Sequence, residues 1–235
     1  TMEVCMIKVF YEDNHCIVVY KPAGMLVQSD ITGDTTLCDE VKEYLKEKGN
    51  KPGEVFLGMV NRIDRPVYGL FIFAKTSKGA SRLSDQIRNH EFEKVYTTVV
   101  EGIVEEKEQT LTHYLVKDER TNTVKAFSTP RSDAKEAILS YKVLGYKGQT
   151  TLLEVQLETG RSHQIRAQLS VIGHPIMGDG KYGSLLDYKK GAIALTASKL
   201  CFNLPVGGER KCIEIPVDNS GFHEKHTTGG CCEGY

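Results

Sequence analysis

The feature that most constrains the fold is a succession of strand-like segments with few helices between them. The strand-like segments are apolar or rich in β-branched residues, and turn residues separate them. They span residues 6–20 (a pair of strands around a turn), 70–75, 94–101, 111–117, 123–129, 137–145, 151–158, 192–203 and 211–217. Helical spacing of apolar residues occurs at 36–48, at 78–90 and in the segment that ends at Gly173. This order predicts one α+β domain over residues 1–217, followed by a polar, Gly-rich and flexible tail at 218–235.

Composition excludes several classes of protein. The 235 residues suffice for one sizeable core, and the chain has no run of the roughly 18 apolar residues that a membrane span needs. The charged N-terminus is not a secretory signal, so we expect a cytoplasmic monomer. The seven cysteines form no C-x-x-C pair, which predicts reduced thiols. His163 and His174 lack a third ligand in register, so we expect no metal.

The charges are distributed unevenly, although the net charge is only -1. Residues 62–94 carry seven Lys or Arg against four Asp or Glu, and residues 161–199 carry six against two. Residues 101–119 carry two against six. If the two basic segments share a face, that face would suit a polyanion, and scattered solvated charge is the alternative interpretation.

Asp64 is the candidate catalytic residue. It stands between Arg62 and Arg65, just before the apolar run 69–74. A neighbouring arginine keeps a carboxylate ionised, and an ionised carboxylate can act as a nucleophile or a base toward an electrophilic carbon. An ordinary solvated turn before a strand has the same composition, so both interpretations stand at this point.

A second candidate segment has the sequence ETGRSHQIRAQLSVIGHPIMGDGKYG, at residues 158–183. It places Arg161, His163, Gln164 and Arg166 at the start of a helix, where the helix N-terminus and the arginine side chains both favour phosphate. A basic solvent-facing helix is the alternative, and one arginine beside the apolar stripe can instead turn inward to a carboxylate.

A third segment, FEKVYTTVVEG at residues 92–102, carries Tyr96 on one face of its strand. A strand tyrosine is either part of the core or, on the face of a cleft, a platform on which a nucleotide base can stack.

Together these segments resemble the RluA/RluD family of RNA pseudouridine synthases, over about residues 9–206. VFYEDNHCIVVYKPAGMLV resembles the opening strand pair and Lys-Pro-Ala-Gly turn of the family, and NRIDRPVYGLFIFAKT resembles the block that holds its catalytic aspartate. EKVYTTVVEG is similar to the Lys-x-Tyr segment, and ETGRSHQIRAQLSVIG to the Gly-Arg-x-His-Gln-Ile-Arg block. The resemblance implies a mixed, largely antiparallel sheet with a central catalytic cleft.

The resemblance also implies the activity, which is isomerisation of uridine to pseudouridine in rRNA or tRNA without cofactor or metal. Asp64 would act at the sugar, either by attacking C1′ or by removing the 2′ proton, and Arg166 would pair with it. Tyr96 would stack on the extruded base, and Arg62 would help to extrude it. The remaining candidates for contact with RNA are Arg65, Lys75, Arg161, His163 and Gln164. The chain starts at the catalytic domain, so we expect no S4-type RNA-binding domain.

The sequence departs from the family pattern at four positions. Asn61 replaces a histidine, Val67 and Tyr68 replace Thr-Ser, and Thr196 stands where a histidine is common. Two other functions remain as alternatives. One is a catalytically silent RNA-binding or ribosome-assembly module, and the other is a glycosidic-bond hydrolase, which normally needs paired carboxylates.

Overall fold

A computed structural model of the chain describes residues 7–49 and 53–217. The expected tail at 218–235 and the cysteines at positions 5, 231 and 232 lie outside the described residues. The strands within the described ranges are β1 (Val9–Glu12), β2 (Cys16–Lys21), β3 (Gly58–Met59), β4 (Tyr68–Ala74), β5 (Glu93–Glu101), β6 (Glu108–Asp118), β7 (Thr123–Phe127), β8 (Lys135–Lys147), β9 (Thr150–Leu157), β10 (Leu195–Asn203) and β11 (Arg210–Glu214). The helices are α1 (Leu37–Gly49), α2 (Ser77–Arg88), α3 (Gln164–Val171) and the 3₁₀ turn η1 (Gly180–Tyr182).

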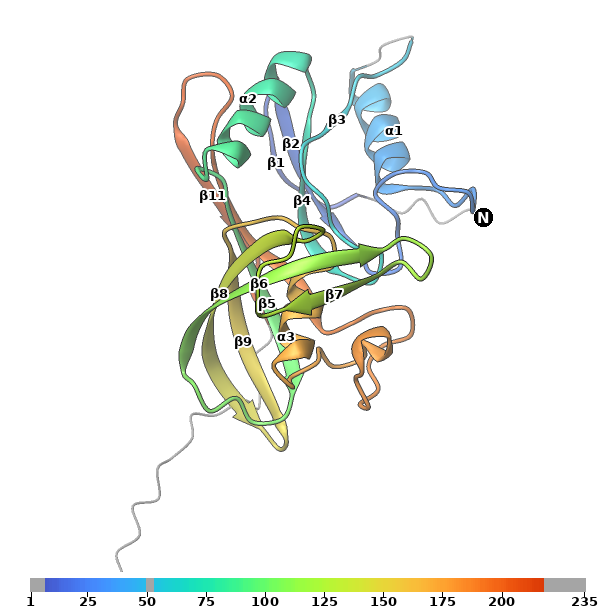
Figure 1. Ribbon diagram of the computed structural model, residues 1–235. Helices are drawn as coiled ribbons and strands as arrows, with labels where there is room; N and C mark the ends of the chain where they lie inside the picture. Colours follow the sequence, from blue (N-terminus) through green and yellow to red (C-terminus); the bar gives the residue numbers. More distant parts are fainter. Residues whose placement is uncertain (1–6, 50–52, 218–235) are drawn as a thin grey trace, which may run out of the picture.

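One sheet connects all of these strands in the order β1-β2-β4-β10-β5-β9-β8-β6-β7, with β3 beside β4 and β11 beside β10. β4 and β10 run parallel, and the other pairs between described strands are antiparallel. Figure 1 shows the long central strands running between an upper part, with α1 and α2, and a lower part, with α3. The predicted α+β class and the largely antiparallel sheet are therefore confirmed.

The contact between β4 and β10 requires a glycine. Gly69 has a φ of 117° and faces Ala197 across the parallel pair. A methyl group on Gly69 would lie 2.3 Å from the Ala197 carbonyl oxygen, so any side chain at this position would collide with the β10 backbone. This close approach joins the strand that follows Asp64 to the middle of the sheet.

The helices pack on the sheet through the apolar stripes seen in the sequence. α1 buries Leu37 and Val41 in the same cluster as Phe71 and Phe73 of β4, and α2 buries Leu83 with the opposite face of that strand. α3 contributes its own stripe to a third cluster, under the lower part of the sheet. The core therefore lies on both faces of the sheet, and each face is covered by different helices.

The predicted elements agree with the structure to within a few residues at most boundaries. The predictions missed the two-residue strand β3 and η1, because both are too short for a periodic pattern. The expectation of reduced thiols is wrong for one pair, since a disulfide joins Cys201 and Cys212. β10 and β11 form a hairpin that sets these two cysteines directly opposite each other. Among the described residues, no helix is long and apolar enough to cross a membrane.

Candidate active site

The loop that carries Asp64 lies between β3 and β4 and is held from below by Lys21, the last residue of β2. The Lys21 side chain is fully buried. Its ammonium donates hydrogen bonds to the carbonyl oxygens of Pro22 (3.1 Å), Arg65 (3.0 Å) and Val67 (2.8 Å). Burial lowers the pKa of Lys21 to about 8. Three donors meet three acceptors, so Lys21 fixes the backbone on the C-terminal side of Asp64.

Asp64 and Asp179 both bind the guanidinium of Arg166. Asp179 accepts two hydrogen bonds from it, at 2.7 and 2.9 Å, whereas Asp64 accepts one, at 3.2 Å. The predicted contact between Arg166 and Asp64 is confirmed. Asp64 does not receive the bidentate fork of the arginine, because Asp179 occupies that fork.

The electrostatics of this cluster keep Arg166 charged. Burial disfavours the charged guanidinium, but the hydrogen bonds and charge of Asp179, reinforced by Asp64, raise the pKa of Arg166 above its ordinary value. The side chain of Asp179 is 2% exposed and that of Asp64 is 25% exposed. Asp179 is therefore an internal counter-ion, and Asp64 is the carboxylate that faces the open space.

His163 and Tyr182 complete the surroundings of Asp64. The His163 Nε2 atom lies 3.8 Å from a carboxylate oxygen of Asp64, and its Nδ1 atom lies 2.6 Å from the Tyr182 hydroxyl. The Arg166 guanidinium lies over the Tyr182 ring, 4.8 Å from its centre. Burial lowers the pKa of His163 against the opposing charge of Asp64, so His163 is neutral at pH 7 and Arg166 is the cation paired with Asp64.

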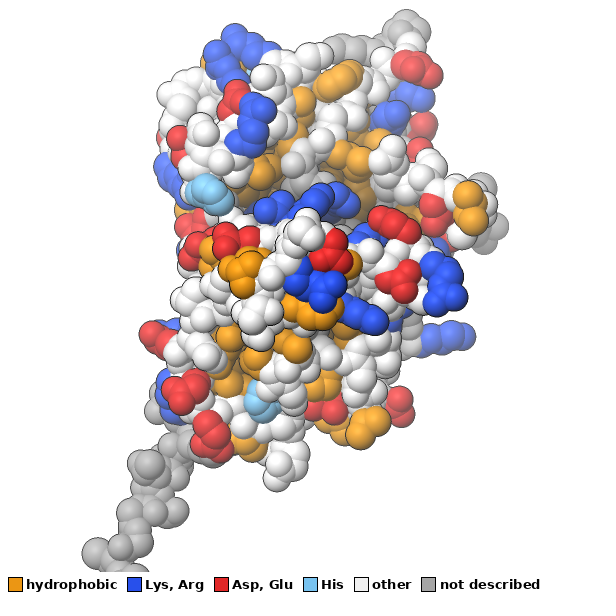
Figure 2. Space-filling model, in the orientation of Figure 1, with side chains coloured by type: hydrophobic (Ala, Val, Ile, Leu, Met, Phe, Trp, Pro, Cys, Tyr) orange, Lys and Arg blue, Asp and Glu red, His pale blue; other side chains and the backbone are white. Residues whose placement is uncertain are grey.

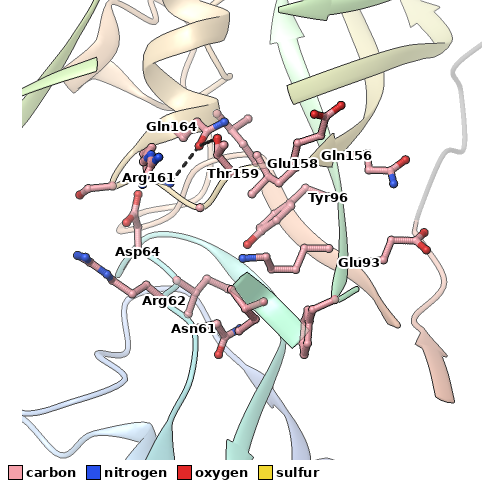
Figure 3. Close-up of a pocket in the computed structure, with 18 of the residues that line it drawn as sticks. Asn61, Arg62, Asp64, Glu93, Tyr96, Gln156, Glu158, Thr159, Arg161 and Gln164 are labelled. Atoms are coloured by element: carbon pink, nitrogen blue, oxygen red, sulfur yellow. Dashed lines mark hydrogen bonds between the residues drawn. The ribbon is translucent and has the colours of Figure 1, made fainter. Parts of the chain in front are cut away.

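Asp64 opens into a cleft of about 670 Å³, within the usual range for ligand sites. Tyr96 lines it from β5, is 7% exposed, and has its pKa raised by burial and by the charge of Asp64. Figure 3 shows the Tyr96 ring in the middle of the cleft, with its hydroxyl directed to the side where Asp64 and Arg62 lie. Residues from both basic segments line this one cleft, and Figure 2 shows Lys and Arg side chains gathered at a hollow across the middle of this face.

The structure divides the five further candidates for contact with RNA. Arg161, His163 and Gln164 line the cleft, but Gln164 is buried and its amide holds the backbone nitrogen of Arg161 and the carbonyl of Ile138. Two candidates do not reach the cleft. Arg65 turns to Asp34 and the carbonyl of Gly24, and Lys75 pairs with Glu12 at the other end of β4.

Two of the four departures from the family pattern face the cleft. Asn61 and Val67 line it, and the Asn61 side-chain oxygen is buried without a hydrogen-bond partner among the described residues. Tyr68 and Thr196 are register partners in the β4–β10 pair and line a smaller hollow elsewhere. The departure at Tyr68 therefore leaves the wall of this cleft unchanged.

Sequence reasoning missed three residues of the site, namely Lys21, Asp179 and Tyr182. The resemblance to the Lys-Pro-Ala-Gly turn gives its lysine no role, and the glycine-rich MGDGKYG segment has no periodicity that would assign one to Asp179 or Tyr182. A signal was present in each segment. A lysine that ends an otherwise apolar strand is a candidate for burial, and an aspartate between two glycines marks a fixed backbone.

The sheet topology and the cleft-facing carboxylate on a buried arginine together indicate the class of enzyme to which the chain belongs, and the comparison with known families names that class. Residues 15–171 match the RNA pseudouridylate synthase family. The chain belongs to this family and is an enzyme, an isomerase that converts uridine in RNA to pseudouridine.

Individual relatives agree with this assignment. The chain is 34% identical over 212 residues to the RNA pseudouridine synthase YlyB of Bacillus subtilis, covering 89% of this chain and 68% of the relative. It is 33% identical over 189 residues to tRNA pseudouridine synthase C of Vibrio cholerae, covering 76% and 75%. The solved structure of human RNA pseudouridylate synthase domain containing 4 has the same fold, with a TM-score of 0.73 and 20% identity over 90% of this chain and 89% of the human chain.

Proposed function

We propose that this chain isomerises a uridine of tRNA, and that Asp64 is the carboxylate that acts at the sugar. The observation that carries the assignment of Asp64 is the asymmetry of the two carboxylates on Arg166. Asp179 is buried and accepts two hydrogen bonds from Arg166, whereas Asp64 has one oxygen that accepts no hydrogen bond from the described residues, and it faces the cleft. This arrangement disfavours a glycoside hydrolase, which needs two working carboxylates.

The cleft supports the roles proposed for its other residues. Arg166 is a positioning residue, because it holds the carboxylate of Asp64 from the side away from the opening. Tyr96 offers a ring face on which an extruded uracil stacks. Arg62 is exposed on the loop of Asp64, where it can enter the RNA stack as the uridine leaves it.

Transfer RNA is the substrate that the relatives favour, because several of them are tRNA pseudouridine synthases. Ribosomal RNA is the alternative RNA, and the experiment below separates the two. We propose further that the enzyme acts in the cytoplasm, which cell fractionation tests, and that it is a monomer, which sedimentation of the purified chain tests.

The test uses unmodified tRNA and rRNA transcripts that carry tritium at uridine C5, because formation of pseudouridine releases that tritium. We expect release from tRNA and not from rRNA. Asp64→Asn should lower the single-turnover rate by at least about 1,000-fold, since a nucleophile or base is lost. It should leave the thermal unfolding temperature within a few degrees of that of the wild type.

Asp187→Asn is the matched control, because Asp187 is exposed and lies outside the cleft. It should retain wild-type turnover. Release from rRNA alone would overturn the choice of tRNA. An Asp64→Asn variant with more than about a tenth of the wild-type rate would overturn the assignment of Asp64.

A further inference from the structure

A lysine, Lys94, also lines the cleft, and none of the roles proposed above uses it. Lys94 precedes Tyr96 by two residues on β5, so both side chains leave the strand on the same face. Both line the cleft that contains Asp64. A methyl group placed on Gly160 would lie 3.1 Å from the Lys94 Nζ atom, so the ammonium rests against the loop that joins β9 to α3.

Lys94 is largely buried, and its ammonium, which keeps access to the cleft, has no protein partner among the described residues. The residue is 9% exposed, and its ammonium makes no hydrogen bond or ion pair within the part of the chain that the structure describes. Burial lowers its pKa, and no neighbouring charge opposes that shift. An unpaired buried charge is costly to the folded state. A lysine kept under these conditions is best explained by a ligand that supplies the missing acceptor.

We propose that Lys94 is a further catalytic residue, whose ammonium binds a carbonyl oxygen of the extruded uracil and stabilises the negative charge that the ring acquires. The inference rests on the proposed function. It adds a residue that acts on the base to the one that acts on the sugar.

The reaction requires such a cation at one stage. The N1–C1′ bond breaks with its electron pair on the uracil ring, and C1′ either bonds to an Asp64 oxygen or forms a double bond to C2′ as the 2′ proton leaves. The detached ring is an anion whose charge is spread over O2 and O4. It then bonds to C1′ through C5, while the bond between C1′ and Asp64 breaks or, in the other route, C2′ takes back its proton. The C5 proton is released and N1 takes up a proton, so the product is an isomer of the substrate.

The position of Lys94 inside the cleft favours the base of the nucleotide over a phosphate group as the ligand of its ammonium. A hydrated phosphate suits the exposed rim, where Arg62 stands, whereas Lys94 is buried beside the Tyr96 ring. Residues two apart on a strand are separated by about 7 Å, a span that a lysine side chain can cover to reach a base stacked on that ring. A cation positioned beside the base before the reaction stabilises most strongly a charge that appears only during the reaction.

The test compares Lys94→Met with the wild type on the tritiated transcripts, at saturating RNA and in single turnover. We expect the rate to fall about 100-fold, as after loss of a group that stabilises charge in the transition state, with the dissociation constant for RNA changed less than about threefold. Lys94→Arg should recover part of the rate. Lys142→Met, which removes a solvent-exposed lysine of β8, should behave as the wild type in both measurements.

The unfolding temperature separates this proposal from a purely structural role of Lys94, because loss of a structural residue would lower that temperature. Removal of an unpaired buried charge should raise the unfolding temperature of Lys94→Met by about 3 °C. A substrate with 5-fluorouridine at the target gives another, because fluorine withdraws electrons and makes uracil a better leaving group. Because C5 of that nucleotide carries fluorine and releases no tritium, its conversion is followed by digestion of the RNA and chromatography of the nucleosides. The defect of Lys94→Met should shrink at least about tenfold on that substrate.

Three outcomes would overturn the proposal. They are an unchanged rate in Lys94→Met, a lower unfolding temperature with a lower rate, or weaker RNA binding with a salt dependence reduced by about one phosphate contact. The last result would make Lys94 a phosphate ligand. If the wild type releases no tritium from any transcript, the proposed function itself fails, and this result differs from all three.

Discussion

Lys21 contacts the backbone of the loop that carries Asp64, whereas Lys94 lines the cleft that Asp64 faces, and the surroundings of the two lysines differ. Both are buried and both have a lowered pKa because of burial. Lys21 meets three carbonyl oxygens, whereas Lys94 meets no acceptor within the described ranges. The difference teaches that burial alone does not assign a role to a lysine. A fully partnered ammonium holds a loop, and an unpartnered one at a cleft is available to a substrate.

The largest effect on the unfolding free energy should come from substitution of Lys21, the lysine whose ammonium has three hydrogen-bond acceptors. Lys21→Met removes the three hydrogen bonds and leaves the carbonyl oxygens of Pro22 and Val67 buried without a donor, which should cost about 3 kcal/mol of unfolding free energy. Urea denaturation measures this loss, and turnover should fall as the loop of Asp64 loosens. Because Lys94→Met is expected to become more stable, the two variants should move in opposite directions. Equal losses of stability would erase the contrast between the two sites.

A smaller effect on the unfolding free energy is expected from substitution of Asp179, the carboxylate that accepts two hydrogen bonds from Arg166. Asp179→Asn keeps the shape of the side chain but leaves Arg166 with a single charged partner, which should lower the unfolding free energy by about 2 kcal/mol. Asp64→Asn should cost less than about 1 kcal/mol, because Asp64 is partly exposed and makes one hydrogen bond. Chemical denaturation of the two variants, measured side by side, shows which carboxylate contributes more to the unfolding free energy. If Asp64→Asn is the more destabilised, Asp64 and not Asp179 is the structural counter-ion.

The smallest effect is a dependence of stability on pH. The pKa of Lys21 is about 8 in the folded chain and near 10.4 in the unfolded chain. The unfolded chain therefore binds more protons between these values, and the stability contributed by this group is lost as the pH falls through 8 and is fully present only above the unfolded pKa. Unfolding free energy should rise by about 1 kcal/mol from pH 7 to pH 9.

Lys21→Met should lack this rise, so the difference between the two denaturation profiles isolates the lysine from other titrating groups. Parallel profiles would show that the Lys21 ammonium is better solvated than its burial indicates.

Local patterns were sufficient to predict the elements and several members of the site. The apolar stripe of α3 predicts its buried face. The position of an arginine beside that stripe leaves an inward turn to a carboxylate as one of two alternatives, and the family resemblance selects Arg166 and Asp64 as the pair. The partition of Arg166 between two carboxylates was not predictable, because Asp179 belongs to a glycine-rich segment without periodicity. The side-chain directions of Arg65 and Lys75 were not predictable either, because the carboxylates that accept their hydrogen bonds lie far away in the sequence.

By itself, the sequence determined the order of strands and helices, the apolar faces that they bury, and the segments that hold Asp64, Tyr96 and Arg166. These features follow from spacing along the chain, which sets which side chains share a face. The tertiary structure alone decided the parallel contact of β4 with β10, the clamp of Lys21 on the loop of Asp64 and the isolation of Lys94. Each of these depends on groups that meet through space from distant parts of the chain, where periodicity carries no information.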